Sequence, residues 1–141
     1  MSVKPFIVLL VEDDENDALL LQRAFHRARL TSMLQVVSNA KQAMSFLEKK
    51  PPFNKIEDYP TPSLLLLDLN LPGTSGLELL EWLRKQPAPL KDLPVIILTS
   101  SRDTEDIDRA YELGANSYMA KPSGNFDELA EMVKEFNPQK S

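Results

Sequence analysis

The sequence predicts an α/β fold of the type (βα)5, a doubly wound parallel sheet in which five strands alternate with five helices. Short apolar runs of strand length alternate with longer segments whose apolar residues recur every three or four positions. Strands that alternate with helices in this way form parallel sheets with helices on both faces. The chain has 141 residues, 43% of them hydrophobic, which suffices for one core but not for two. We therefore expect a single domain over residues 1–141, with a core over about 5–136.

The first part of the chain supplies two strands and two helices. Residues 6–11 are an uninterrupted apolar run, typical of a strand that is buried on both faces. Apolar residues at helical spacing predict a helix over about 15–29. Residues 35–38 form a short strand candidate, and a second helical pattern over 40–47 follows Asn39, which is a suitable N-cap.

The remaining chain repeats the alternation. Four leucines at 64–67 predict a second buried strand, and residues 95–98 predict a third. Between them we expect a helix that begins near Thr74 or Ser75 and ends at about residue 83. The last elements are a weakly apolar helix, a short strand and a closing helix, predicted over residues 107–113, 117–120 and 126–136.

Residues 51–62 interrupt the pattern, because they contain four of the eleven prolines and exceed the usual connection of about 2–6 residues. Two interpretations stay open. The segment could be a surface loop held against the core by Phe53, Ile56 or Tyr59. It could instead be an insertion that contacts a partner or a second copy of the chain.

Composition excludes several classes of protein. The net charge of −5 disfavours direct nucleic-acid binding, which normally requires a basic excess. The absence of cysteine excludes disulfides, thiolate catalysis and thiolate metal sites, and it fits the cytoplasm. The longest apolar run has six residues, far short of the ~18 of a membrane span. We therefore expect a cytoplasmic protein with no membrane segment.

The excess negative charge lies in one segment, residues 12–17, which holds five acids and no base; elsewhere acids and bases balance. Polar groups also follow the other strands. In parallel sheets the carboxyl ends of the strands share one edge, where ligands bind. We expect the residues that follow four of the five strands to converge there: Glu12, Asp13, Asp68, Asn70, Thr99 and Lys121.

These groups fit phosphoryl chemistry. Carboxylates at the ends of neighbouring strands repel one another unless a pKa rises or a cation binds, and Mg²⁺ prefers such oxygen ligands. The hydroxyl of Thr99 and the ammonium of Lys121 would help to counter the charge of a transferring phosphoryl group. One carboxylate could itself be the nucleophile.

A structural role is the alternative for some of the acids. Asp14, Glu15 and Asp17 are expected to serve the start of the next helix. Asp68 is not explained in this way, because the helix after it begins only beyond Pro72 and Gly73.

Four strings, in this order and spacing, resemble the response-regulator receiver domains of two-component signalling. They are Leu-Leu-Val-Glu-Asp-Asp at 9–14, Leu-Leu-Leu-Leu-Asp-Leu-Asn-Leu-Pro-Gly at 64–73, Pro-Val-Ile-Ile-Leu-Thr-Ser at 94–100 and Gly-Ala-Asn-Ser-Tyr-Met-Ala-Lys-Pro at 114–122. The resemblance implies a flavodoxin-like fold with strand order 2-1-3-4-5. It also implies a phosphoacceptor signalling domain rather than an enzyme, without an attached output domain.

The resemblance assigns a role to each residue of the metal and acceptor site. Asp68 would accept the phosphoryl group from a sensor histidine kinase. Asp13 would bind Mg²⁺ directly, and Glu12, where many relatives have aspartate, would act through metal-bound water. Asn70 would offer its backbone carbonyl to the metal. Positions Asn70 and Ser101 would tune the lifetime of the phosphoaspartate.

Further residues would carry the switch. Thr99 would hydrogen-bond the phosphoryl group, and Lys121 would pair with Asp68 or its phosphate. Tyr118 would be the aromatic residue whose rotamer follows activation. The helix over 107–113 would then move, because its few apolar residues hold it weakly.

A narrower resemblance concerns the single-domain regulators that partner bacterial phytochromes. It rests on the long loop at 51–62 and on the strings near Asp68 and Tyr118. Members pair through the fourth helix, fifth strand and fifth helix, so a homodimer is implied; Ile107, Tyr111 and Phe126 could serve that face or belong to the core. Output would pass to a downstream protein target or a phosphotransfer protein.

Three other functions fit the sequence less well. A haloacid-dehalogenase-type phosphatase would carry an acid where Asn70 stands, and its other acids would lie downstream of Asp68. A pseudo-receiver would lack part of the quartet Asp13, Asp68, Thr99 and Lys121, which is complete here. A dinucleotide site would need glycine in the first turn after residue 11, and none is present.

Overall fold

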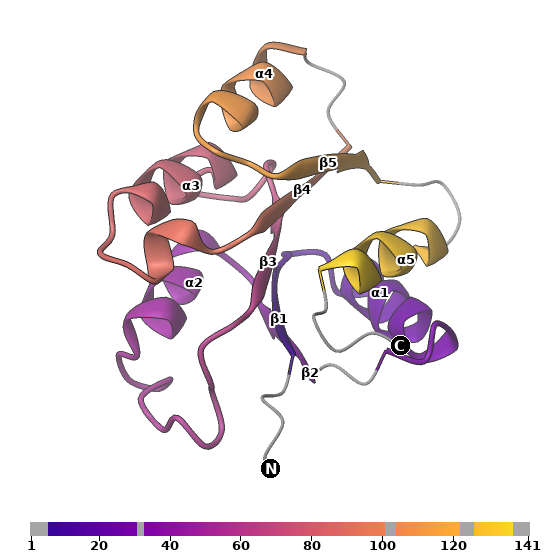
Figure 1. The fold of residues 1–141 in the computed structure, drawn as a ribbon, viewed down its shortest axis with the longest axis horizontal. Helices are drawn as coiled ribbons and strands as arrows, with labels where there is room; N and C mark the ends of the chain where they lie inside the picture. Colours follow the sequence, from indigo (N-terminus) through magenta and orange to yellow (C-terminus); the bar gives the residue numbers. More distant parts are fainter. Residues whose placement is uncertain (1–5, 31–32, 101–103, 122–125, 137–141) are drawn as a thin grey trace.

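The computed structural model describes residues 6–30, 33–100, 104–121 and 126–136, and these form a five-stranded parallel sheet flanked by helices (Figure 1). The sheet order is β2-β1-β3-β4-β5. The strands are β1 Ile7–Val11, β2 Met33–Val37, β3 Leu64–Asp68, β4 Val95–Thr99 and β5 Ser117–Ala120. The helices are α1 Glu15–Arg27, α2 Ala40–Glu48, α3 Gly76–Arg84, α4 Thr104–Glu112 and α5 Asp127–Glu135. The (βα)5 prediction and its strand order are confirmed.

Some of the predicted boundaries differ from the observed ones by a few residues. Helix α4 begins at Thr104, three residues before the predicted start, because residues 104–106 carry no apolar side chain that could mark the helix. A short 3-10 helix, η1 Leu90–Asp92, was not predicted. The longest helix, α1, has 13 residues, and no helix of the described segments is long and apolar enough to cross a membrane.

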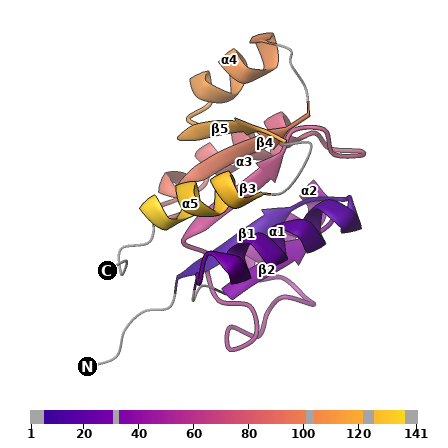
Figure 2. The same ribbon diagram turned by 90° about the vertical axis from the view of Figure 1, so that its right-hand side faces the viewer.

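Helices cover both faces of the sheet. Figures 1 and 2 show α1 and α5 on one face and α2 and α3 on the other. Along β1, Val8 and Leu10 pack with the first pair, whereas Leu9 and Val11 pack with the second. Every residue of β1, β3 and β4 is buried. This burial on both faces explains why these strands are continuous apolar runs.

The long connection between α2 and β3 is a surface loop held by two aromatic rings. Phe53 and Tyr59 lie with their ring centroids 5.3 Å and 5.7 Å from that of Phe46, and 5.1 Å from each other. Of the three residues considered as anchors, Phe53 and Tyr59 therefore hold the loop, whereas Ile56 is 55% exposed and does not. The side-chain amide of Gln35 also donates to the carbonyl of Asp58, at 3.3 Å, and so links the loop to β2.

Candidate functional site

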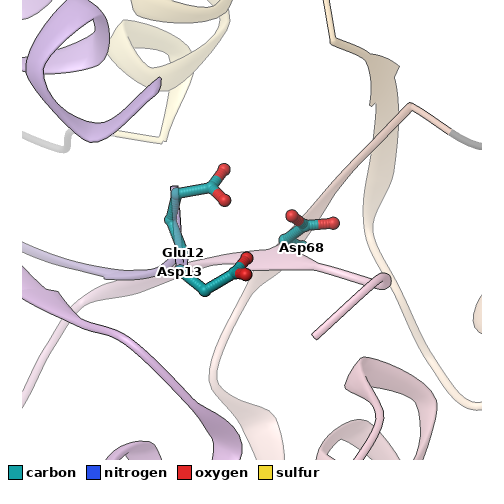
Figure 3. Close-up of side chains that lie close together, drawn as sticks. All are labelled: Glu12, Asp13 and Asp68. Atoms are coloured by element: carbon teal, nitrogen blue, oxygen red, sulfur yellow. The ribbon is translucent and has the colours of Figure 1, made fainter. Parts of the chain in front are cut away.

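Three carboxylates meet at the carboxyl ends of the two central strands. Because Val11 of β1 lies beside Leu67 of β3, the residues that follow Val11 lie next to Asp68, the last residue of β3. Glu12, Asp13 and Asp68 each offer a carboxylate oxygen within 4.8 Å of the others. Figure 3 shows the three side chains facing a common space. Glu12 and Asp68 are buried and Asp13 is exposed, so the cluster opens to solvent on one side. Such a set of hard oxygen donors fits a divalent cation.

The ammonium of Lys121 enters this cluster from the residue after β5. The backbone N–H of Lys121 donates to the carbonyl of Thr99 at 2.9 Å, which extends the ladder between β4 and β5. Its Nζ lies 2.7 Å from Oε1 of Glu12 and 2.8 Å from Oδ2 of Asp68. The same Nζ lies 3.1 Å from Oδ2 of Asp17. An ammonium has three N–H donors, and each can face one of these carboxylates.

The pKa values of Glu12 and Lys121 are both raised, which favours the neutral form of the acid and the charged form of the lysine. Burial, together with the charge of Asp68, raises the pKa of Glu12 to about 7, although the hydrogen bond from Lys121 acts against this. Burial alone would lower the pKa of Lys121, but its hydrogen bonds to Asp68, Glu12 and Asp17 outweigh that effect and raise it above the usual value. The lysine therefore stays charged, while burial, with a smaller contribution from the charge of Asp68, lets Glu12 hold a proton near neutrality.

Asn70 connects Asp68 with Thr99. Its backbone N–H donates to Oδ1 of Asp68 at 2.9 Å, and its side-chain amide donates to Oγ1 of Thr99 at 2.9 Å. Thr99 is the last residue of β4 and is fully buried. A hydroxyl is thereby held beside the acid cluster by the loop that follows β3.

A glycine allows helix α3 to begin close to Asp68. A Cβ atom on Gly76 would lie 2.6 Å from the carbonyl oxygen of Asp68 and 2.8 Å from Cα of Leu69, nearer than real Cβ atoms approach. The N–H of Gly76 donates to the carbonyl of Leu69 at 3.3 Å, and Ser75 caps the helix. The loop that carries Asn70 is thus closed tightly against the strand end.

The structure brings six of the predicted site residues together: Glu12, Asp13, Asp68, Asn70, Thr99 and Lys121. The seventh, Tyr118, lies on β5, partly buried against the side of the sheet that α2 and α3 cover. Ser101 lies outside the described residues.

The structure corrects one expectation and decides between two alternatives. Asp14 caps α1 as predicted, accepting from the N–H groups of Asn16 and Asp17 at 2.8 Å and 3.1 Å. Asp17, however, was assigned only to the helix start, yet it also contacts Lys121, because the lysine side chain reaches from the residue after β5 to the first turn of α1. Of the two alternatives for Phe126, a dimer face or the core, the structure supports the core, because this residue is 2% exposed.

Comparison with known sequences identifies relatives over nearly the whole chain. The model of the response regulator receiver domain family matches residues 8–134. The response regulator Rcp1 of Synechocystis sp. is 37% identical over 133 residues, which cover 94% of this chain and 87% of Rcp1.

Solved structures give the same result. The phosphorylated cyanobacterial phytochrome response regulator RcpA superposes with a TM-score of 0.85 at 28% identity, covering 98% of this chain and 97% of RcpA. The Mn²⁺-bound form of Rcp1 superposes with a TM-score of 0.78 at 37% identity, covering 92% and 89% of the two chains. The bacteriophytochrome response regulator RtBRR gives 0.80 at 34% identity, covering 95% and 79%. Phytochrome response regulators are thus among the relatives, as the narrower resemblance predicts. The chain belongs to the response regulator receiver domain family, and it is a signalling protein rather than a conventional enzyme.

Proposed function

We propose that Asp68 is the residue that accepts the phosphoryl group in this receiver, with Mg²⁺ held by Glu12, Asp13, Asp68 and the backbone carbonyl of Asn70. One observation carries the proposal: the buried Asp68 carboxylate belongs to the three-carboxylate cluster and also receives the Lys121 ammonium at 2.8 Å. Glu12 would act through metal-bound water. A divalent ion is named for one relative, the Mn²⁺-bound form of Rcp1.

Three residues of the chain, Asp68, Lys121 and Thr99, would have different roles in the phosphoryl transfer. A carboxylate oxygen of Asp68 attacks the phosphorus of a phosphohistidine, the P–N bond breaks, and the leaving imidazole keeps the electron pair and takes a proton. Lys121 faces the charge that develops on the phosphoryl oxygens, and the hydroxyl of Thr99 hydrogen-bonds to them. The metal, when bound, supplies further positive charge at the same place.

We propose that the conformational response to phosphorylation begins with a shift of Thr99. Its hydroxyl now accepts from the Asn70 amide, and a phosphoryl group would offer it a competing partner. A shift of Thr99 would leave space for the ring of Tyr118 to turn inward. Helix α4 would move with it, since Ala110 is the only residue of α4 that is fully buried.

The partners follow from the family and its relatives. Receiver domains take their phosphoryl group from histidine kinases, and we propose a bacterial phytochrome as the kinase because several relatives are phytochrome response regulators. A homodimer through α4, β5 and α5 would use Tyr111, which is 47% exposed, and not the buried Phe126. Output would pass to a protein target or a phosphotransfer protein in the cytoplasm, without contact to nucleic acid or membrane.

Incubation with a small phosphodonor and Mg²⁺, followed by intact mass measurement, tests the acceptor assignment. We expect one added phosphoryl group in the unmodified chain, none after chelation of the metal and none in Asp68→Asn. Asp92→Asn, which changes an exposed aspartate outside the cluster, is the matched control and should be labelled normally. Labelling of Asp68→Asn to the same extent as the unmodified chain would overturn the assignment.

A further inference from the structure

The three acceptors of Lys121 are not equivalent. Two of them, Glu12 and Asp68, also belong to the carboxylate cluster that fits a divalent ion. Their second oxygens already accept other hydrogen bonds, Oε2 of Glu12 from the N–H of Asp14 at 3.2 Å and Oδ1 of Asp68 from the N–H of Asn70 at 2.9 Å. A cation in the cluster would therefore draw on oxygens that already have partners, including those that face Lys121.

Asp17 stands apart from that competition. It lies in the first turn of α1 and is not a member of the three-carboxylate cluster. Its Oδ2 lies 3.1 Å from Nζ of Lys121, and 27% of its side chain is exposed. The lysine side chain is only 14% exposed, so water alone cannot replace lost carboxylate partners around the ammonium.

We propose that Asp17 is a positioning residue: it keeps the Lys121 ammonium paired and directed at Asp68 when a divalent ion engages Glu12 and Asp68. This deepens the proposed function and rests on it. The same contact would hold Lys121 after transfer, when the negative charge at Asp68 lies on the phosphoryl oxygens and no longer on the carboxylate. It would also offset the repulsion between the ammonium and the divalent ion.

This role makes the effect of Asp17 depend on the state of the site. Without metal, Lys121 retains Glu12 and Asp68 at 2.7 Å and 2.8 Å, so loss of the Asp17 charge should change little. With metal, the ion engages Glu12 and Asp68, and a lysine that lacks Asp17 loses its carboxylate partners in a place where its side chain is only 14% exposed. The ammonium is then held less firmly, and the ion binds more weakly because its ligands are taken from an ammonium that has no other carboxylate.

The test compares Asp17→Asn with Glu15→Gln, which removes the same charge from an exposed residue of the same helical turn. The ¹⁵N signal of the Lys121 ammonium, assigned by its loss in Lys121→Arg, reports how firmly that group is held. We expect the unmodified chain and Glu15→Gln to keep this signal in metal-free and Mg²⁺-loaded protein. Asp17→Asn should keep it without metal and lose it to rapid proton exchange with Mg²⁺. Its Kd for Mg²⁺ should rise about fivefold, against less than about twofold for the control.

Two results would overturn the inference: an ammonium signal that survives Mg²⁺ loading in Asp17→Asn, or an equal loss in Glu15→Gln. Failure of the proposed function looks different, because the unmodified chain itself would then show no Mg²⁺ binding. The metal-free spectrum of Asp17→Asn also reports whether the variant is folded.

Discussion

The inner strands of the sheet and its β5 edge differ in how deeply they are buried. In β1, β3 and β4 every residue is buried, and these strands carry the acid cluster and Thr99 at their ends. At the edge of the sheet, β5 has no buried residue, and only Ala110 of the neighbouring helix α4 is fully buried. Figure 1 shows α4 at the margin of the molecule, beyond β5.

This difference supports the different tasks that we propose for the two regions. Phosphoryl chemistry needs groups held in place before the reaction, and strands buried on both faces provide that. A conformational response needs an element whose displacement costs little free energy, and we propose the weakly buried α4–β5 edge as that element. Lys121 joins the two, because it follows β5 and reaches carboxylates at the ends of β1 and β3.

Truncation of one apolar residue in each region should show the largest contrast. Leu66 in β3 is 0% exposed, so Leu66→Ala should lower the free energy of unfolding by about 2–5 kcal/mol. Ile107 in α4 is only partly buried, and Ile107→Ala should cost about 1 kcal/mol. Urea unfolding of both variants measures the difference. Equal losses would mean that α4 is held as firmly as the central strands.

The acid cluster should make stability depend on pH. The folded-state pKa of Glu12, about 7, exceeds its ordinary value of 4.5, so the folded protein binds this proton more tightly than the unfolded chain does. This contribution is therefore fully present below pH 4.5 and is lost as pH rises to about 7, at a cost of roughly 1–3 kcal/mol. Urea unfolding in chelator between pH 5 and 8 should show that loss in the unmodified chain, and Glu12→Gln should reduce it. An unchanged slope in Glu12→Gln would assign the dependence to other groups.

A smaller effect should come from the arginine that connects α3 with the turn before β5. The guanidinium of Arg84 donates to the carbonyls of Lys91, Leu93 and Gly114 at 2.9, 2.8 and 2.7 Å. Gly114 leaves the space for this contact, since a Cβ there would lie 2.8 Å from Nε of Arg84. Arg84→Gln should cost about 1–2 kcal/mol and speed amide exchange at Gly114.

Lys85→Gln is the matched control for this variant. Lys85 is the exposed residue next in sequence and pairs only with Glu81 among the ion pairs described, so its loss should cost under about 0.5 kcal/mol. Similar effects of the two variants would show that the Arg84 contacts do not hold the turn.

One property of the sequence predicted both the order of the elements and the position of the site: the buried strands are apolar throughout, and polar residues follow them. Strands buried on both faces must be apolar throughout, so the polar residues Glu12 and Asp68 mark where β1 and β3 reach the edge of the sheet. Parallel pairing then places those ends together. The residue types at the site could therefore be found by spacing alone, whereas their roles depended on resemblance to a family.

Contacts that depend on how one element sits over another could not be predicted. The Asp17–Lys121 pair joins residues 104 positions apart and requires the lysine side chain to reach from the residue after β5 to the first turn of α1. The bond from Asn70 to Thr99 depends on the turn of a loop. In the long loop, Phe53 and Tyr59 pack while Ile56 does not, although all three are apolar enough to anchor it.

Hydrogen exchange with a phosphate mimic tests the central proposal most directly: the inner strands stay fixed around the phosphorylation site, whereas the α4–β5 edge changes conformation. Beryllium fluoride with Mg²⁺ is added to the unmodified chain and to Asp68→Asn, and exchange is followed by peptide mass. We predict a several-fold change in exchange over α4 and β5, none over β1 and β3, and none anywhere in Asp68→Asn. Helix α4 protected equally with and without the mimic in the unmodified chain would contradict the account.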